Sequence, residues 1–140
     1  MGGHQNGGFE EIEHTADKAL HIHGRNLEQL LVNAAKGMNN LMIADVSKLP
    51  TGIKKSVAVE ALDAESLLVE WLSELAYLAE TEMLVFNKFD LHTVAATHVR
   101  ATLWGGPVQK LEKHIKAVTY HNLKIVKTDT GLEATVVFDV

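Results

Sequence analysis

Apolar residues recur at helical spacing in two segments of the chain, each preceded by a residue suited to cap a helix. Asn26, with Gln29 three residues later, opens the first segment, and Asp63 opens the second. Leu62 and Leu67 flank the second cap, where they would form a hydrophobic staple. The apolar stripes comprise Leu27, Leu30, Leu31, Ala34, Ala35, Met38, Leu41 and Met42, then Leu67, Leu68, Trp71, Leu72, Leu75, Ala76 and Leu78. This spacing predicts two amphipathic helices that pack on a sheet.

Much of the remaining chain alternates between apolar and polar positions, which is typical of strands. The expected strands are residues 9–14, 18–23, 57–61, 84–95, 98–104, 115–126 and 132–139. Because they cluster in hairpins and do not alternate with the helices, we expect a single α+β domain, a mostly antiparallel mixed β-sheet packed with two main α-helices. The domain should span residues 9–140. The glycine-rich residues 1–8 should be a flexible leader or an expression remnant.

The composition narrows the chemistry that the chain can carry. Cysteine is absent from the 140 residues, which excludes disulfides, zinc–thiolate sites, iron–sulfur clusters and thiol nucleophiles. The 18 acids against 13 bases, a net charge of −5, argue against a broad phosphate-binding surface. The sequence has neither a phosphate-binding glycine loop nor a Gly-x-Ser-x-Gly elbow. Without a signal-peptide core or an apolar run of membrane length, we expect a cytoplasmic protein that does not enter membranes.

An acid ends the last predicted strand, where nothing structural requires one. Asp139 is followed by Val140, so its side chain and the terminal carboxylate of Val140 bring several oxygen donors together. Oxygen donors suit hard cations, and calcium, magnesium and manganese all fit this description. The sequence therefore predicts a divalent metal ion at this strand end.

A second acid, Asp17, closes the polar tetrapeptide His14-Thr15-Ala16-Asp17 between the first two predicted strands. One interpretation is a turn in which Asp17 hydrogen-bonds its own backbone. The other is functional, because a carboxylate at a strand end is well placed to bind a metal or accept a proton.

The position of His121 relative to Asp139 depends on one turn. The segment Asp129-Thr130-Gly131 suits a three-residue hairpin loop with Gly131 in the left-handed conformation. This register places His121 directly opposite Asp139, whereas a two-residue loop places Tyr120 there. The structural alternative is an ordinary edge strand whose charged residues face solvent.

Other polar and aromatic residues have structural explanations. His21 and His23 share one strand face and form a candidate metal clamp, although solvent exposure or packing explains them more simply. Glu74 is expected on a solvated helix face, because the helix lacks the Glu-x-x-His pattern of metal-binding bundles. Trp71 and Trp104 are expected in the core or at its rim, since basic and aromatic residues are not interleaved around them in the sequence.

Four separated motifs resemble the archease family in their order and spacing. They are His14–Asp17, Asp63–Leu68 with Trp71–Leu75, Ile115–His121, and Phe138–Val140. The resemblance runs from about Phe9 to the last residue, and Lys116–His121 is its most specific segment. Archeases are small α+β proteins that activate the GTP-dependent RNA ligase of tRNA splicing and RNA repair. The resemblance thus implies a non-catalytic activator that promotes guanylylation and repeated turnover of that ligase.

The resemblance also implies which residues matter. The family's metal-binding acids correspond by motif to Asp17 and Asp139, and the terminal carboxylate of Val140 would complete the site. The positions expected around this site are His14, Glu74, Lys116, Thr119 and His121. The chain departs from the family pattern at Gly105-Gly106-Pro107, where an acid is expected after the glycine. The resemblance leaves open the oligomeric state and whether RNA is contacted directly or through the ligase.

Two other classes of function compete with a ligase activator. A stand-alone metal-dependent phosphohydrolase would use Asp17 and Asp139 as ligands and His121 as general base. A modulator or chaperone of a tRNA-modifying methyltransferase, which has been proposed for the family, would bind that enzyme instead of the ligase.

Overall fold

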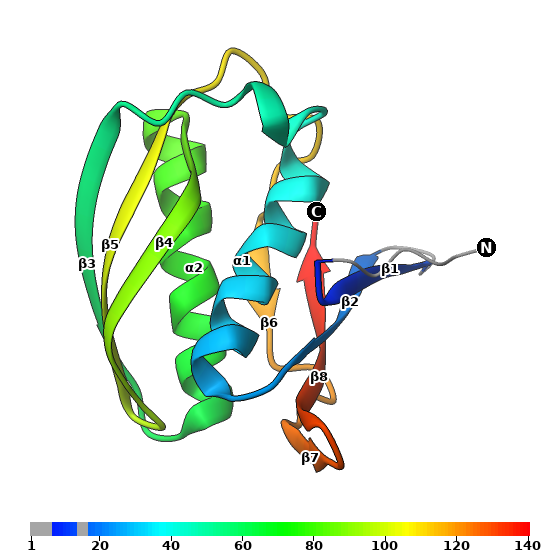
Figure 1. Cartoon of the computed structure of the whole chain (residues 1–140). Helices are drawn as coiled ribbons and strands as arrows, with labels where there is room; N and C mark the ends of the chain where they lie inside the picture. The colour runs from blue at the N-terminus through cyan, green and yellow to red at the C-terminus, as the bar shows by residue number, and fades with distance from the viewer. Residues whose placement is uncertain (1–6, 14–16) are drawn as a thin grey trace.

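Two antiparallel sheets enclose two helices in the computed structural model, which describes residues 7–13 and 17–140 (Figure 1). The first sheet has the order β1 (Phe9–Glu13), β2 (Asp17–Gly24), β8 (Gly131–Asp139) and β6 (Ala117–Thr119), with β7 (Val126–Thr128) also paired to β8. The second has the order β3 (Ile53–Glu60), β5 (His98–Pro107) and β4 (Leu84–Ala95). The helices are α1 (Leu27–Met42) and α2 (Ala64–Glu82), and a 3₁₀ turn covers Val46–Lys48. The predicted α+β class is confirmed, with the strands divided between two sheets.

Both helices begin at the predicted caps. Asn26 accepts a hydrogen bond from the Gln29 N–H at 2.9 Å, and Asp63 accepts one from the Ser66 N–H at 2.8 Å. The bond from Ser66 favours the ionised form and lowers the pKa of Asp63. The predicted staple is wrong, because the Leu62 side chain is 93% exposed and does not cover the cap. Within the described residues, no helix is long and apolar enough to cross a membrane.

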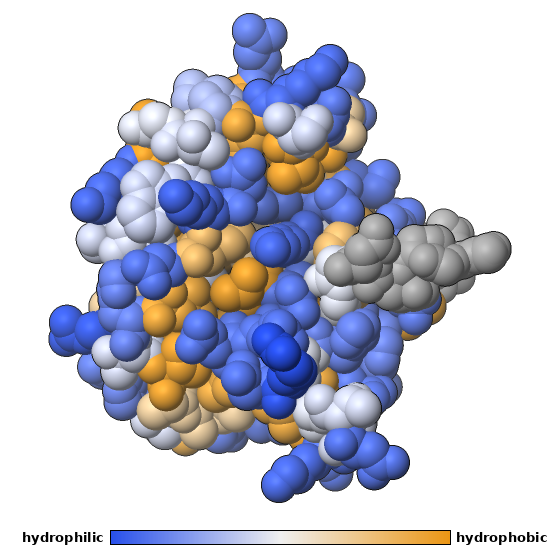
Figure 2. Space-filling view, in the orientation of Figure 1, coloured by the Kyte–Doolittle hydropathy of each residue, from blue (hydrophilic) through white to orange (hydrophobic). Residues whose placement is uncertain are grey.

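The core lies between the sheets and is built around the two helices. Trp71 on α2 is fully buried, and its indole N–H donates to the carbonyl of Leu31 on α1 at 2.9 Å. Its ring lies 6.2 Å from that of Phe89 on β4, centroid to centroid. The Asn39 amide on α1 donates to the carbonyl of Phe86 on β4 at 2.7 Å. In the view of Figure 2, apolar residues reach the surface between the sheets and are surrounded by hydrophilic ones.

The predicted strand 115–126 is interrupted. It forms β6 and β7, and the chain leaves the sheet over residues 120–125. A turn begins there, with the Leu123 N–H donating to the Tyr120 carbonyl at 3.0 Å and Asn122 at a φ of 51°. Glu65 on α2 then accepts a hydrogen bond from the Ile125 N–H at 3.0 Å, which ties the end of this segment to α2. The interruption changes the pairing of every residue before it.

The turn between β7 and β8 is also shorter than predicted. Thr128 pairs with Gly131, which leaves a loop of Asp129 and Thr130, and the three-residue loop is wrong. Gly131 has a φ of +152°, and a Cβ there would collide with the backbone of Gly24. The glycine is therefore required by the close approach of β8 to the end of β2.

Candidate functional site

The structure places Asp17 and Asp139 directly opposite each other on the neighbouring antiparallel strands β2 and β8. Residues in this relation carry their side chains on the same face of the sheet, with Cβ atoms about 4.5–5.5 Å apart. Asp17 is half-buried and Asp139 is exposed. Asp17 is the first residue of β2, which brings it to the acid that ends β8. We call these two residues the carboxylate pair.

The carboxylate pair lies on the outer face of its sheet. Phe138, the preceding residue of β8, is fully buried in the core, so Asp139 points to the opposite face. Like charges directly opposite each other in a sheet are destabilising. Within residues 7–13 and 17–140, neither carboxylate forms an ion pair with a Lys or Arg. The pair is therefore a place where a bound cation would relieve repulsion.

The carboxylate oxygens of the pair are the type of ligand that a hard cation binds. Both are carboxylates, the ligands that calcium, magnesium and manganese take. No three His, Asp or Glu side chains gather into a metal cluster in the part of the chain that the structure describes. His14 lies outside the described residues, and the side chain of Val140 packs against the core. The predicted metal ion and the role of the Val140 carboxylate stay predictions.

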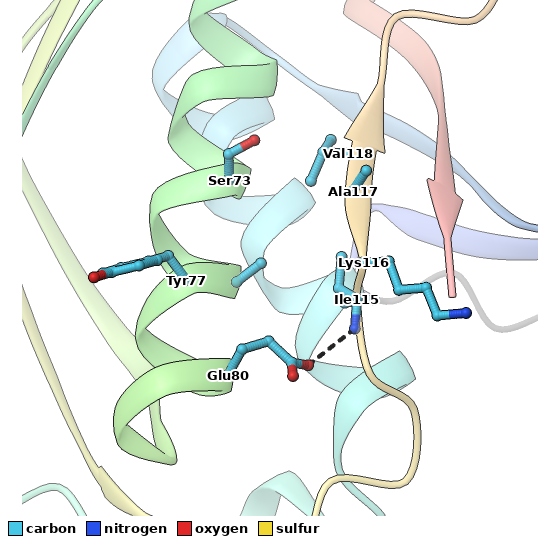
Figure 3. A pocket seen from close by; sticks show the side chains of 8 residues that line it. Ser73, Tyr77, Glu80, Ile115, Lys116, Ala117 and Val118 are labelled. Carbon is cyan, nitrogen blue, oxygen red and sulfur yellow. Dashed lines mark hydrogen bonds between the residues drawn. The ribbon is translucent and has the colours of Figure 1, made fainter.

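Strand β6 borders the pair on the other side of β8. Ala117 is directly opposite Asp139, and the N–H of Lys116 donates to the Asp139 carbonyl at 2.7 Å. The Lys116 side chain is exposed and extends toward the end of β8, away from α2 (Figure 3). The backbone of Lys116 is thus bonded to that of Asp139, and a role for its side chain at the site stays a prediction.

A groove of about 230 Å³ separates the start of β6 from α2 (Figure 3). It is lined by Ser73, Ala76, Tyr77, Glu80, Ile115, Lys116, Ala117 and Val118. At its end, Glu80 accepts a hydrogen bond from the Ile115 N–H at 3.1 Å and lies 3.0 Å from Nδ1 of His114. Because Ile115 is fixed to α2 and the next N–H is bonded to β8, the backbone of Lys116 is held from both sides.

The predicted contact between His121 and Asp139 is wrong. Thr119 pairs with Val137, and His121 follows in the loop, so Ala117 takes the place opposite Asp139. The Thr119 hydroxyl donates to the Val137 carbonyl at 2.9 Å and accepts from the His121 N–H at 3.3 Å. The prediction assumed an unbroken strand from residue 115 to residue 126. Because residues 120–125 leave the sheet, neither the register of a three-residue turn nor that of a two-residue turn applies to β6. The Thr119 side chain is thus hydrogen-bonded to the backbone of β8.

The remaining candidates are spread over the molecule. Glu74 is half-buried on α2, and no hydrogen bond or ion pair within the described residues connects it to the carboxylate pair. His21 lies 3.1 Å from the Thr135 hydroxyl and 3.2 Å from a carboxylate oxygen of Glu133. His23 is exposed. The contacts of His21 with β8 favour the structural interpretation of this histidine pair.

Comparison with known proteins identifies close relatives. The model of the archease protein family matches residues 9–140. Protein archease of Methanosarcina mazei is 37% identical over 140 residues, which cover 94% of this chain and 95% of that protein. Protein archease of Methanothermobacter thermautotrophicus is 31% identical over 139 residues, covering 95% and 99% of the two chains.

Two solved structures have the same fold. The solution structure of Methanobacterium thermoautotrophicum protein 1598 has a TM-score of 0.80 and 31% identity, covering 96% of this chain and 99% of that one. The crystal structure of an archease from Thermotoga maritima, described as a possible chaperone, has a TM-score of 0.65 and 25% identity. That likeness covers 94% of this chain and 96% of the other.

Proposed function

This chain belongs to the archease family, and from this premise we propose that it is an accessory protein that activates the GTP-dependent RNA ligase of tRNA splicing and RNA repair. It promotes guanylylation of the ligase and its repeated turnover, and it is not itself the catalyst. The observation that carries the proposal is the carboxylate pair, Asp17 opposite Asp139, with Lys116 beside it. This polar site lies at a strand end, where a partner's active site can reach it.

The roles of the residues follow from their charges and positions. Asp17 and Asp139 hold a divalent cation, for which calcium, magnesium and manganese are the candidates. When bound, such an ion supplies positive charge that neutralises nucleotide phosphates. Lys116 adds a flexible ammonium group, because its backbone is fixed to β8 while its side chain is exposed.

Divalent cations should raise the melting temperature of the wild-type protein. An ion that binds only the folded state stabilises it by about 2.7 kcal/mol at a free concentration of 100 Kd. Scanning calorimetry with calcium, magnesium and manganese in turn measures this effect. Asp139→Asn should lose the shift, because it removes one ligand charge. Asp129→Asn, which removes an exposed acid from the β7–β8 turn, is the matched control and should keep it. Equal shifts in Asp139→Asn and wild type would contradict the metal site.

The observations weaken one of the two alternative functions and favour the other. A stand-alone phosphohydrolase loses its predicted general base, because His121 is not opposite Asp139. The description of the Thermotoga maritima archease as a possible chaperone favours the second candidate, a modulator of a tRNA-modifying methyltransferase. Both candidates are partner-binding proteins and differ in the partner.

A binding comparison separates these functions. The purified protein is tested against the GTP-dependent RNA ligase and against a tRNA methyltransferase, with a phosphoester panel and divalent metal as a third arm. We expect a complex with the ligase and no phosphoester turnover by the protein alone. Binding to the methyltransferase but not to the ligase would favour the chaperone function over ligase activation. Phosphoester turnover by the protein without a partner would indicate an enzyme.

A further inference from the structure

Trp104 is flanked by two lysines that come from different strands. It lies on β5, the central strand of the three-stranded sheet, with Lys54 of β3 and Lys88 of β4 directly opposite it on either side. The Nζ atoms lie 6.0 Å and 5.0 Å from the centroid of the indole ring, respectively. Basic and aromatic residues are thus interleaved across the sheet, although they are far apart in the sequence.

These side chains lie on the outer face of the sheet. Leu103, which precedes Trp104, is fully buried in the core, so the indole points the other way. Figure 1 shows both helices on the inner side of β3, β5 and β4. The ring of Trp104 is half-buried by its neighbours on the strands and remains partly open to solvent.

Core packing does not explain a tryptophan at this position. Trp71 is a tryptophan with a packing role, because it is fully buried and its indole N–H is hydrogen-bonded to α1. Trp104 instead has lysines on both sides, and the next outer-face position of β5 is Thr102, paired with Ser56 and Asp90. An aromatic ring among polar and basic groups on an open sheet face is a feature of surfaces that bind single-stranded nucleic acids.

We propose that the outer face of the three-stranded sheet binds single-stranded nucleic acid, with Trp104 as the stacking platform and Lys54 and Lys88 contacting the phosphates. A base that stacks on the indole displaces an ammonium group from the ring face, and the long lysine side chain can still reach the phosphate of that nucleotide. The bases of a duplex are already stacked on one another, so a single strand is favoured. The proposal stands on these three residues and not on ligase activation.

Other charged residues lie farther along this face. Arg100 is exposed four residues before Trp104 on β5, which places it about 13 Å farther along the same face. Asp90 is the nearest acid in register, and its carboxylate lies 3.7 Å from Nδ1 of His92. Glu60 pairs with His98 at the end of the sheet remote from Trp104. The residues directly opposite Trp104 are both lysines, so the overall charge of −5 does not describe this part of the face.

Titration with a 12-nucleotide oligouridylate tests the proposal, with two independent signals. Intrinsic fluorescence should be quenched, because the partly open Trp104 can stack on a base while the buried Trp71 cannot. Anisotropy of a labelled oligouridylate then gives the affinity of each variant. Trp104→Ala should weaken binding roughly 5- to 100-fold, and Trp104→Phe, which keeps a ring, should retain most of it. Lys54→Gln and Lys88→Gln should each reduce the slope of log K against log salt by roughly 0.7.

Controls distinguish this site from general attraction. Lys127→Gln removes an exposed lysine on β7 and should leave affinity and salt dependence unchanged. The Lys54→Gln/Lys88→Gln double variant retains the indole, so it remains informative if Trp104→Ala does not fold. Absence of quenching, or equal binding by the double variant and wild type, would overturn the proposal. Equal affinity for duplex, or preference for phosphatidylserine vesicles, would do the same. Asp139→Asn should bind oligouridylate normally, which separates this site from ligase activation.

Discussion

Replacing Trp71 by alanine should lower the free energy of unfolding by about 3–5 kcal/mol, the cost typical of removing a buried aromatic side chain. Trp71 is fully buried between α1 and the three-stranded sheet. The substitution leaves a cavity and removes the hydrogen bond from the indole to the Leu31 carbonyl. Since this contact joins the two helices, its loss weakens the centre of the core. Urea unfolding followed by circular dichroism measures the change.

Two variants control for volume and for position on the helix. Trp71→Phe keeps an aromatic ring but loses the hydrogen bond, so its cost should lie well below that of alanine. Tyr77→Ala changes another aromatic residue of α2, which is 60% exposed and should cost far less. A Trp71→Ala protein within 1 kcal/mol of wild type, on the scale of an ordinary surface change, would contradict the packing described for this core.

Asp17→Asn and Asp139→Asn should each reduce stimulation of the ligase by at least about tenfold. Loss of an outer residue that only orients a metal ligand costs about 10- to 100-fold, and loss of a ligand charge should cost no less. The fold should be retained, because asparagine is close in size and the change removes repulsion between opposed carboxylates. The initial rate of ligase guanylylation measures the effect.

The matched control is again Asp129→Asn, since Asp129 is an exposed acid of the same hairpin but lies at its turn. It should stimulate the ligase as wild type does. Circular dichroism and the melting temperature verify that each variant is folded. Full stimulation by Asp17→Asn and by Asp139→Asn would show that the carboxylate pair has no part in activation.

The helices could be predicted from the sequence because their signals are local. A cap and the residue that donates to it are three positions apart at Asn26 and at Asp63, and the apolar stripe follows at once. The hydrophobic staple failed because Leu62 has to turn toward the helix, and local spacing does not determine that direction.

The register of the C-terminal strands depended on contacts that no short segment reveals. Glu65 on α2 holds the loop after β6 by accepting the Ile125 N–H, and this contact joins residues 60 positions apart. The short turn at Gly131 is fitted to the backbone of Gly24, which belongs to β2. A prediction made from the hairpin alone therefore placed His121 opposite Asp139, where the structure has Ala117.

The two surface sites differ in how far sequence reasoning could go. Asp17 and Asp139 were expected together because the family motifs contain both, and the pairing of β2 with β8 supports this. The surroundings of Trp104 were missed, because a search for basic residues along the sequence does not see neighbouring strands. The usable signal was the period of two in the strands, which places Lys54, Lys88 and Trp104 on one face once the sheet order is known.

The most direct test of the central claim is the rate at which the GTP-dependent RNA ligase becomes guanylylated with and without a substoichiometric amount of this protein. The measurement is made in calcium, magnesium and manganese separately. If the protein activates the ligase, guanylylation should be faster in at least one metal, and each molecule of protein should support many ligase turnovers. An unchanged rate and an unchanged number of turnovers in all three metals would contradict the proposed function.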